Sequence, residues 1–295
     1  ITDIADGMFS GCTSLTDIDY PSKLETIGNE AFRSCRSITA IKIPEGVTSI
    51  APRAFYGCAS LTDITLPDSL EAIGNTVFTG TKWIRENEKD HMVITNNGFL
   101  VKYTGNAIDL TIPDNVTYIA PYLFNNNKDL ERVVLSDKIK VLAEGIFSNC
   151  SSLKEISLSK KLKEIGDSTF SNCTSLTKLT FPGTLESIGN YAFSNSGLIS
   201  VKLPEGLTTL GYNTFSNCDT LQEVWIPLTL TTIERYSFSW NDNLTKIHIP
   251  STVTKINKDA FTNYRNVTEN PTIYCRKGSY ADEYAQKYEF KVKYE

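Results

Sequence analysis

Residues 61–83 read LTDITLPDSLEAIGNTVFTGTKW and contain the pattern that decides the fold. Ile64 and Leu66 are separated by one polar residue, so both apolar side chains lie on the same face of a short strand. Pro67 follows at once and ends the strand, because proline has no amide hydrogen to donate to a sheet. A glycine-containing corner then leads to Phe78. The segment predicts one coil, made of a short strand and a turn-rich return.

The same pattern recurs along the chain with a period of about 23 residues. The phenylalanine column consists of Phe9, Phe32, Phe55, Phe78, Phe124, Phe147, Phe170, Phe193, Phe215, Phe238 and Phe261. Five positions earlier stands a column of Ile4, Ile27, Ile50, Ile73, Ile119, Leu142, Ile165, Ile188, Leu210, Ile233 and Ile256. Two matching columns of this length do not arise by chance, so the chain is a repeat array.

Coils of this kind bury their apolar edges only by stacking on one another. The strands of successive coils then lie parallel, about 4.8 Å apart. The sequence therefore predicts a repeat solenoid over residues 1–270, mostly strand and loop with little helix.

The repeat resembles that of a known protein family. Residues 37–58 read SITAIKIPEGVTSIAPRAFYGC, residues 175–193 read SLTKLTFPGTLESIGNYAF, and the tail 272–294 reads TIYCRKGSYADEYAQKYEFKVKY. All three are similar to the BspA-type leucine-rich repeats of bacterial surface proteins. The resemblance implies a curved solenoid with a parallel β-sheet on its concave face. It also implies an extracellular or cell-surface location, adhesion to proteins of a host or another cell, and no catalytic residues.

Two segments depart from the repeat. Residues 82–106 replace a standard coil, and Asn97-Gly98 between alternating apolar residues predicts a β-hairpin there. We interpret this hairpin as a tolerated variation of the family or, alternatively, as a binding protrusion or a bend. Residues 271–295 are expected to form a C-terminal cap, with Ser279 at the start of a helix over 280–287 and a strand near 290–294. Ile1 falls in the middle of a repeat, so we expect further protein upstream.

Six of the seven cysteines share one position of the repeat, three residues after the phenylalanine: Cys12, Cys35, Cys58, Cys150, Cys173 and Cys218. Other coils place Thr81, Asn127, Ser196, Asn241 or the bulkier Tyr264 there. An inward slot for a small side chain explains this interchange, so buried free thiols are expected. A labile disulfide between neighbours such as Cys12 and Cys35 is the alternative.

Composition and motifs exclude several classes of function. The net charge of −5 argues against a nucleic-acid-binding protein, and no apolar stretch reaches the roughly 20 residues of a membrane span. The cysteines lack the clustered spacing of a metal site, and no nucleophile or phosphate-loop motif is present. We therefore expect no enzyme, no cofactor and no metal.

Binding residues are expected on the solvent side of the strands, on either side of each central apolar residue. Trp225 is unusual at such a position, where most residues are small or charged, and tryptophan is frequent in binding hot spots. We predict a protein-binding site made of Trp225, His248, Lys202, Lys246 and Glu223. Alternatively, Trp225 folds over a neighbouring coil.

The leading hypothesis is an adhesion module that binds host or other-cell surface or matrix proteins as a monomer. A structural spacer, and a carbohydrate-binding module that uses Trp225, Trp240 and Tyr236, are the alternatives.

Overall fold

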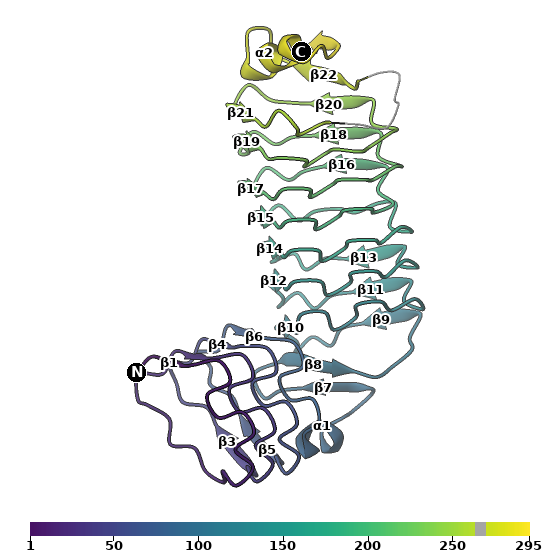
Figure 1. Cartoon of the computed structure of the whole chain (residues 1–295). Helices are drawn as coiled ribbons and strands as arrows, with labels where there is room; N and C mark the ends of the chain where they lie inside the picture. Colours follow the sequence, from purple (N-terminus) through teal and green to yellow (C-terminus); the bar gives the residue numbers. More distant parts are fainter. Residues whose placement is uncertain (263–269) are drawn as a thin grey trace. The chain divides into compact units, whose positions relative to one another are not determined.

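The computed structural model describes residues 1–262 and 270–295, which form two compact units (Figure 1). Unit 1 comprises Ile1–Gly105 and Asn115–Leu123, and unit 2 comprises Asn106–Asp114 and Phe124–Glu295. Each unit is a stack of coils, so the predicted parallel solenoid is confirmed.

One strand ladder is formed by the I-x-L segments that the sequence predicts. In unit 1 it pairs β3 (Ala40–Lys42) with β5 (Asp63–Thr65). In unit 2 it forms the three-stranded sheet β9 (Asp109–Thr111), β11 (Arg132–Val134) and β13 (Glu155–Ser157). It continues in the five-stranded sheet β16 (Ser200–Lys202), β18 (Glu223–Trp225), β20 (Lys246–His248), β22 (Thr272–Cys275) and β23 (Val292–Tyr294). All these pairs are parallel, and each three-residue strand from β3 to β20 buries its central residue.

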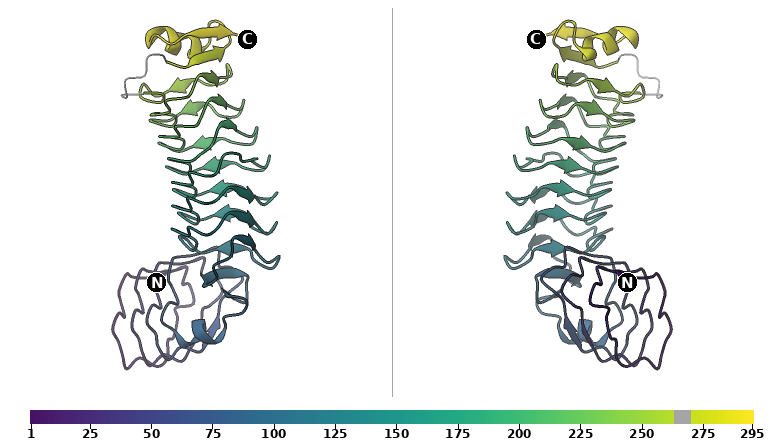
Figure 2. Two further views of the ribbon diagram at one scale, coloured as in Figure 1. Left: turned by 90° about the vertical axis from the view of Figure 1, so that its right-hand side faces the viewer. Right: turned by 90° about the vertical axis from the view of Figure 1, so that its left-hand side faces the viewer.

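A second ladder runs along the other edge of the coils (Figure 2) and was not predicted as strand. It is built from the aliphatic column that precedes each phenylalanine. In unit 1 it contains β1 (Asp3–Ile4), β2 (Thr26–Ile27), β4 (Ser49–Ile50) and β6 (Ala72–Ile73). In unit 2 it contains β12 (Val141–Leu142), β14 (Glu164–Ile165), β15 (Ser187–Ile188) and β17 (Thr209–Leu210), followed by β19 (Thr232–Ile233) and β21 (Lys255–Ile256). Strands of two residues are too short to show the alternation that marks a strand in a sequence.

The phenylalanine column forms the core of both units. Neighbouring rings are stacked, with centroids 5.1–5.9 Å apart from Phe9 to Phe78 in unit 1. The centroid separations are 5.1–5.7 Å from Phe124 to Phe261 in unit 2. These separations are close to the spacing of parallel strands, so a ring in each coil covers the ring of the next.

From Phe9 to Phe238, the turn after the phenylalanine is held by a residue in the left-handed region. The second residue after the ring has φ between 56° and 63° at Asn126, Asn149, Asn172, Asn195 and Asn217, and glycine or serine takes this place in unit 1. Asparagine tolerates this conformation better than most residues. Its side chain also donates from coil to coil, for example from Asn172 to Asn149 at 2.9 Å and from Asn195 to Asn172 at 2.7 Å.

Residues 82–106 contain the antiparallel pair β7 (Met92–Ile94) and β8 (Phe99–Tyr103), joined through Asn97-Gly98. β8 also pairs in parallel with β10 (Tyr118–Ile119). A short helix that the sequence analysis did not predict, α1 (Lys82–Glu86), precedes the hairpin with Thr81 as its N-cap. Trp83 of α1 lies edge-on to Phe78 at 5.6 Å and covers the end of the ring stack in unit 1.

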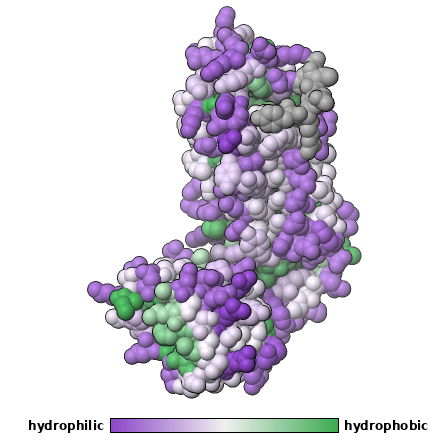
Figure 3. Space-filling model, viewed as in Figure 1, coloured by the Kyte–Doolittle hydropathy of each residue, from purple (hydrophilic) through white to green (hydrophobic). Residues whose placement is uncertain are grey.

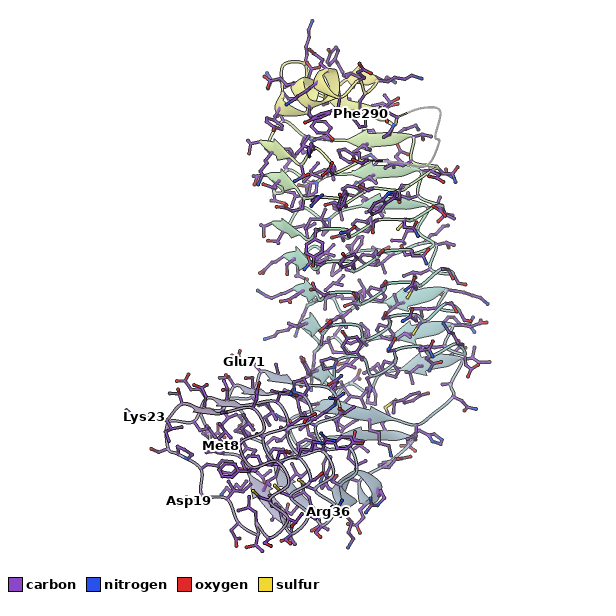
Figure 4. All side chains as sticks on the ribbon, in the orientation of Figure 1. Met8, Asp19, Lys23, Arg36, Glu71 and Phe290 are labelled. Atoms are coloured by element: carbon purple, nitrogen blue, oxygen red, sulfur yellow. The ribbon has the colours of Figure 1, made fainter. Side chains whose placement is uncertain are left out.

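The chain ends in helix α2 (Tyr280–Lys287), with the Ser279 hydroxyl accepting the Asp282 amide hydrogen, and then β23. The ring centroids of Tyr284 in α2 and of Phe290 lie 6.0 and 6.1 Å from that of Phe261. Phe290 is labelled in Figure 4. The cap therefore covers the last ring of the stack.

Apolar residues gather at the N-terminal end of unit 1 (Figure 3). They line a hollow of about 290 Å³ that includes Ile4, Met8 and Phe9. The stacked coils of unit 2 present mainly hydrophilic and neutral residues in the same view.

Candidate recognition surface

The five-stranded sheet of unit 2 brings one row of side chains together on its outward face. The parallel register places Lys202 of β16 beside Trp225 of β18, and Trp225 beside His248 of β20. The row continues with Tyr274 of β22 and Lys293 of β23. We call these five residues the aromatic row.

The three rings of the aromatic row are stacked. The centroids of Trp225 and His248 are 5.2 Å apart with an interplanar angle of 7°. Those of His248 and Tyr274 are 4.5 Å apart at 28°. The Lys293 ammonium lies 5.3 Å from the centre of the Tyr274 ring, within the range of a cation–π interaction. These contacts fix the orientation of the rings on the sheet.

Charged groups fix the middle of the row. The two imidazole nitrogens of His248 each face a carboxylate, Nε2 at 3.0 Å from Glu223 and Nδ1 at 3.1 Å from Glu295. Lys246 Nζ lies 3.7 Å from the same Glu223 carboxylate. The side chains of His248 and Glu223 are both largely covered, so these contacts restrict their rotamers.

The structure brings together all five residues of the predicted binding site, with Lys202 and Trp225 in neighbouring strands and Glu223 bridging Lys246 and His248. Trp225 is half-buried and stacks on the next coil, as one of the two interpretations expects, while part of its ring remains exposed. Whether it anchors a partner stays a prediction. Tyr236 and Trp240 stack on each other in the turn after β19, with ring centroids 5.1 Å apart.

Tyr274 and Lys293 were not predicted from the sequence as members of this row. Residues 272–274 repeat the polar–apolar–polar order of the strands, but Ile273 follows Ile247 by 26 residues and not by 23. Because of this longer interval, the 23-residue period does not predict Tyr274 as the next residue of the column. The T-I-Y order of residues 272–274 was the sequence signal that could have indicated a further strand.

The cysteine column has a role that its spacing did not reveal. In the described residues all seven cysteines are free, and all are buried except Cys12. Each buried Sγ of the column lies 3.0–3.2 Å from the carbonyl oxygen of the phenylalanine in the preceding coil, at Cys35, Cys58, Cys150, Cys173 and Cys218. Asn241 makes the same bond through its amide. The other residues at this position bond differently: Thr81 donates to the Phe78 carbonyl of its own coil, the Asn127 side-chain carbonyl accepts the Asp129 and Leu130 amide hydrogens, and the Ser196 hydroxyl lies 3.4 Å from Cys218 Sγ. Tyr264 lies outside the described residues.

Burial raises the pKa of these thiols, to about 12 for Cys58 and about 11 for Cys150 and Cys218. Well below about pH 8 the thiols are protonated in both the folded and the unfolded chain, so their ionisation does not affect stability. Above pH 9 the unfolded chain loses thiol protons that the folded chain keeps, so the free energy of unfolding falls as the pH rises toward 11.

The variant Cys150→Ser keeps a hydrogen-bond donor to the Phe124 carbonyl, and its hydroxyl does not titrate in this pH range. We expect urea denaturation to show that this variant loses about 2 kcal/mol less between pH 8 and pH 11 than the unaltered chain. Equal losses of stability in the variant and the unaltered chain would contradict the raised pKa of the Cys150 thiol.

Other site types find no support in the part of the chain that the structure describes. No group of histidine, cysteine and carboxylate side chains among these residues has the arrangement of a metal site. None of the described helices is long and apolar enough to cross a membrane.

Solved structures of repeat proteins resemble the chain. A leucine-rich repeat protein of T. pallidum is 21% identical with a TM-score of 0.52, over 70% of this chain and 96% of the other. A leucine-rich repeat protein from Bacteroides ovatus ATCC 8483 is 23% identical with a TM-score of 0.44, over 100% and 88% of the two chains. A leucine rich cell surface protein from Faecalibacterium prausnitzii A2-165 is 26% identical with a TM-score of 0.41, over 84% and 76%. No curated protein matches the sequence.

The repeat itself matches a family description. The BspA type leucine rich repeat region is found in 6 copies, over residues 1–99, 92–221 and 142–268. Because these matches span nearly the whole chain, and because its coils stack as the repeat requires, the chain belongs to the BspA-type leucine-rich repeat family.

Proposed function

We propose that this chain is a protein-binding module that recognises its partner through the outward face of the sheet β16-β18-β20-β22-β23. The aromatic row is the observation that carries the proposal. Three stacked rings stand at outward strand positions, with Lys202 at one end and Lys293 at the other.

The physical chemistry of interfaces supports this assignment. Tryptophan and tyrosine supply large contact areas and are enriched in hot spots, while charged residues form the rim. Here the rings are stacked on one another and on a hydrogen-bonded sheet. Little side-chain entropy remains to be lost on binding, which favours affinity.

Family membership supports the wider setting of the proposal. BspA-type leucine-rich repeats are repeats of bacterial surface proteins, so we propose that the chain lies outside the cell or at its surface. In this setting its partners are proteins of a host or of another cell, and it acts as a monomer. We propose no catalytic activity.

Truncation of Trp225 tests the proposal. The chain and its Trp225→Ala variant are passed over immobilised extracellular-matrix and plasma proteins, and binding is followed by surface plasmon resonance. We expect saturable binding to at least one protein and a dissociation constant raised about 30-fold in the variant, as for a hot-spot residue. Val134→Ala is the matched control, because Val134 is also an exposed apolar residue at an outward strand position. It is expected to bind normally.

Two alternatives give different outcomes in the same experiment. A structural spacer binds none of the proteins, and Trp225→Ala changes nothing. A carbohydrate-binding module binds a glycan array and loses its protein targets when they are deglycosylated. Either result would contradict the protein-binding proposal.

A further inference from the structure

The strand ladder of unit 2 is interrupted at residues 177–182. This segment follows β13 and precedes β16, and it carries the usual I-x-L-like sequence, T-K-L-T-F-P. It forms no strand, and the ladder divides there into the sheets β9-β11-β13 and β16-β18-β20-β22-β23 (Figure 1).

Backbone hydrogen bonds show where the ladder opens. The residue after each strand normally donates to the next coil: Leu135 to Ser157 at 3.0 Å, Leu203 to Trp225 at 3.1 Å, and Ile226 to His248 at 3.0 Å. The equivalent amide is that of Leu158. Among the described residues, no backbone bond joins it to the coil of Thr180. The edge of β13 therefore has a donor without the usual acceptor.

Where the ladder opens, a large side chain stands in a slot that is otherwise aliphatic. The residue after the strand is isoleucine or leucine in the coils that pair normally, but it is Phe181 here. The Phe181 ring stands edge-on to Phe193 at 5.7 Å and 87°. Tyr20 occupies the same slot in unit 1, stands edge-on to Phe32, and its coil also lacks the strand. An aromatic ring in this slot is thus associated with an open ladder in both units.

The opening is a cleft of about 680 Å³, within the size range of ligand-binding pockets. Leu158, Leu179 and Phe181 line it and are half-buried. The residues equivalent to Leu158 and Phe181 in other coils are buried (Leu135, Leu203 and Ile226), as are Val201 and Val224, which are equivalent to Leu179. The cleft therefore has apolar walls that the neighbouring coils do not expose.

The charges at the mouth favour an anionic ligand. Four cationic side chains and one carboxylate, Glu155, line the cleft. Arg132 is paired with Asp109 and Lys154 with Glu131. Lys160 and Lys178 are exposed and form no ion pair within residues 1–262 and 270–295. Two lysines without an ion pair thus line the cleft together with Glu155, whose charge already interacts with Arg132.

We propose that this cleft binds an extended acidic segment of a partner protein, which lies in the opening beside β13. Its backbone accepts the amide hydrogen of Leu158, its apolar side chains contact Leu179 and Phe181, and its carboxylates pair with Lys160 and Lys178. Extended peptides are commonly recognised through main-chain hydrogen bonds combined with pockets for their side chains. The site is separate from the aromatic row and does not depend on it.

A synthetic peptide of alternating aspartate and valine, with a fluorescent label, is the probe. Fluorescence anisotropy at low ionic strength compares the unaltered chain with three variants. Lys160→Gln/Lys178→Gln removes the two free cations. Lys140→Gln/Lys255→Gln removes two exposed lysines outside the cleft and is the matched control. Phe181→Leu restores the usual residue and is expected to close the cleft, and circular dichroism checks that each variant folds.

We expect saturable binding that is about tenfold weaker in Lys160→Gln/Lys178→Gln and nearly unchanged in the matched control, since close charge pairs steer and hold a ligand. Phe181→Leu is expected to weaken binding to a similar extent and to slow hydrogen exchange at the Leu158 amide. The proposal is overturned if both double variants bind alike, if a lysine–valine peptide binds as well as the aspartate–valine peptide, or if no saturable binding is seen. None of these results bears on Trp225.

Discussion

Phe170→Ala is expected to lower the free energy of unfolding by about 3–5 kcal/mol, the usual effect of removing a large core side chain. Phe170 is fully buried and stacks on Phe147 at 5.6 Å and on Phe193 at 5.2 Å. The cavity would interrupt the ring stack in the middle of unit 2. Because contacts in a solenoid join neighbouring coils, the loss also uncouples the coils on either side.

Urea denaturation followed by circular dichroism measures this loss. Tyr212→Ala is the matched control, since Tyr212 is an aromatic residue of unit 2 with an exposed side chain. It should change stability by no more than about 0.5 kcal/mol. A Phe170→Ala protein as stable as the control would contradict the stacked-ring core.

Asn241→Ala should be nearly as damaging, by about 3 kcal/mol, because three buried bonds end on one side chain. The Asn241 amide donates to the carbonyl oxygens of Phe215 at 2.9 Å and Phe238 at 3.0 Å. Its carbonyl accepts the Cys218 amide hydrogen at 2.6 Å. Each buried group left without a partner costs about 1–3 kcal/mol.

The repeat itself supplies the control for this substitution. Asn241→Cys introduces the residue that most coils have at this position, and its thiol can donate to Phe215 as Cys218 donates to Phe193. Its loss of stability in urea is expected to be about half that of the alanine variant. Equal losses in the two variants would show that donation to the preceding coil is not what this column provides.

The parts of the fold that depend on a regular period could be predicted from the sequence. The phenylalanine column, the strands with a buried central residue and the Ser279 helix cap all follow from side-chain periodicity or local chemistry. The two-residue ladder could not be predicted in this way. Helix α1 was also missed, because only Thr81 marks its start and it is five residues long.

The candidate sites show the same limit. Lys202, Trp225 and His248 were predicted as neighbours because the period holds from β16 to β20. Tyr274 lies after a change of period, so its place in the row depends on tertiary pairing. The cleft at Phe181 depends on how a larger ring changes the stacking of coils, which no spacing rule contains.

The most direct test of the recognition surface is the ratio of two dissociation constants for one protein partner, measured with Trp225→Ala and with Tyr212→Ala. Trp225 lies in the predicted strand ladder, and Tyr212 follows β17 in the ladder on the other edge of the coils (Figures 1 and 2). The proposed surface predicts that Trp225→Ala binds about 30-fold more weakly than Tyr212→Ala, which should bind like the unaltered chain. Equal dissociation constants, or a greater loss in Tyr212→Ala, would contradict it.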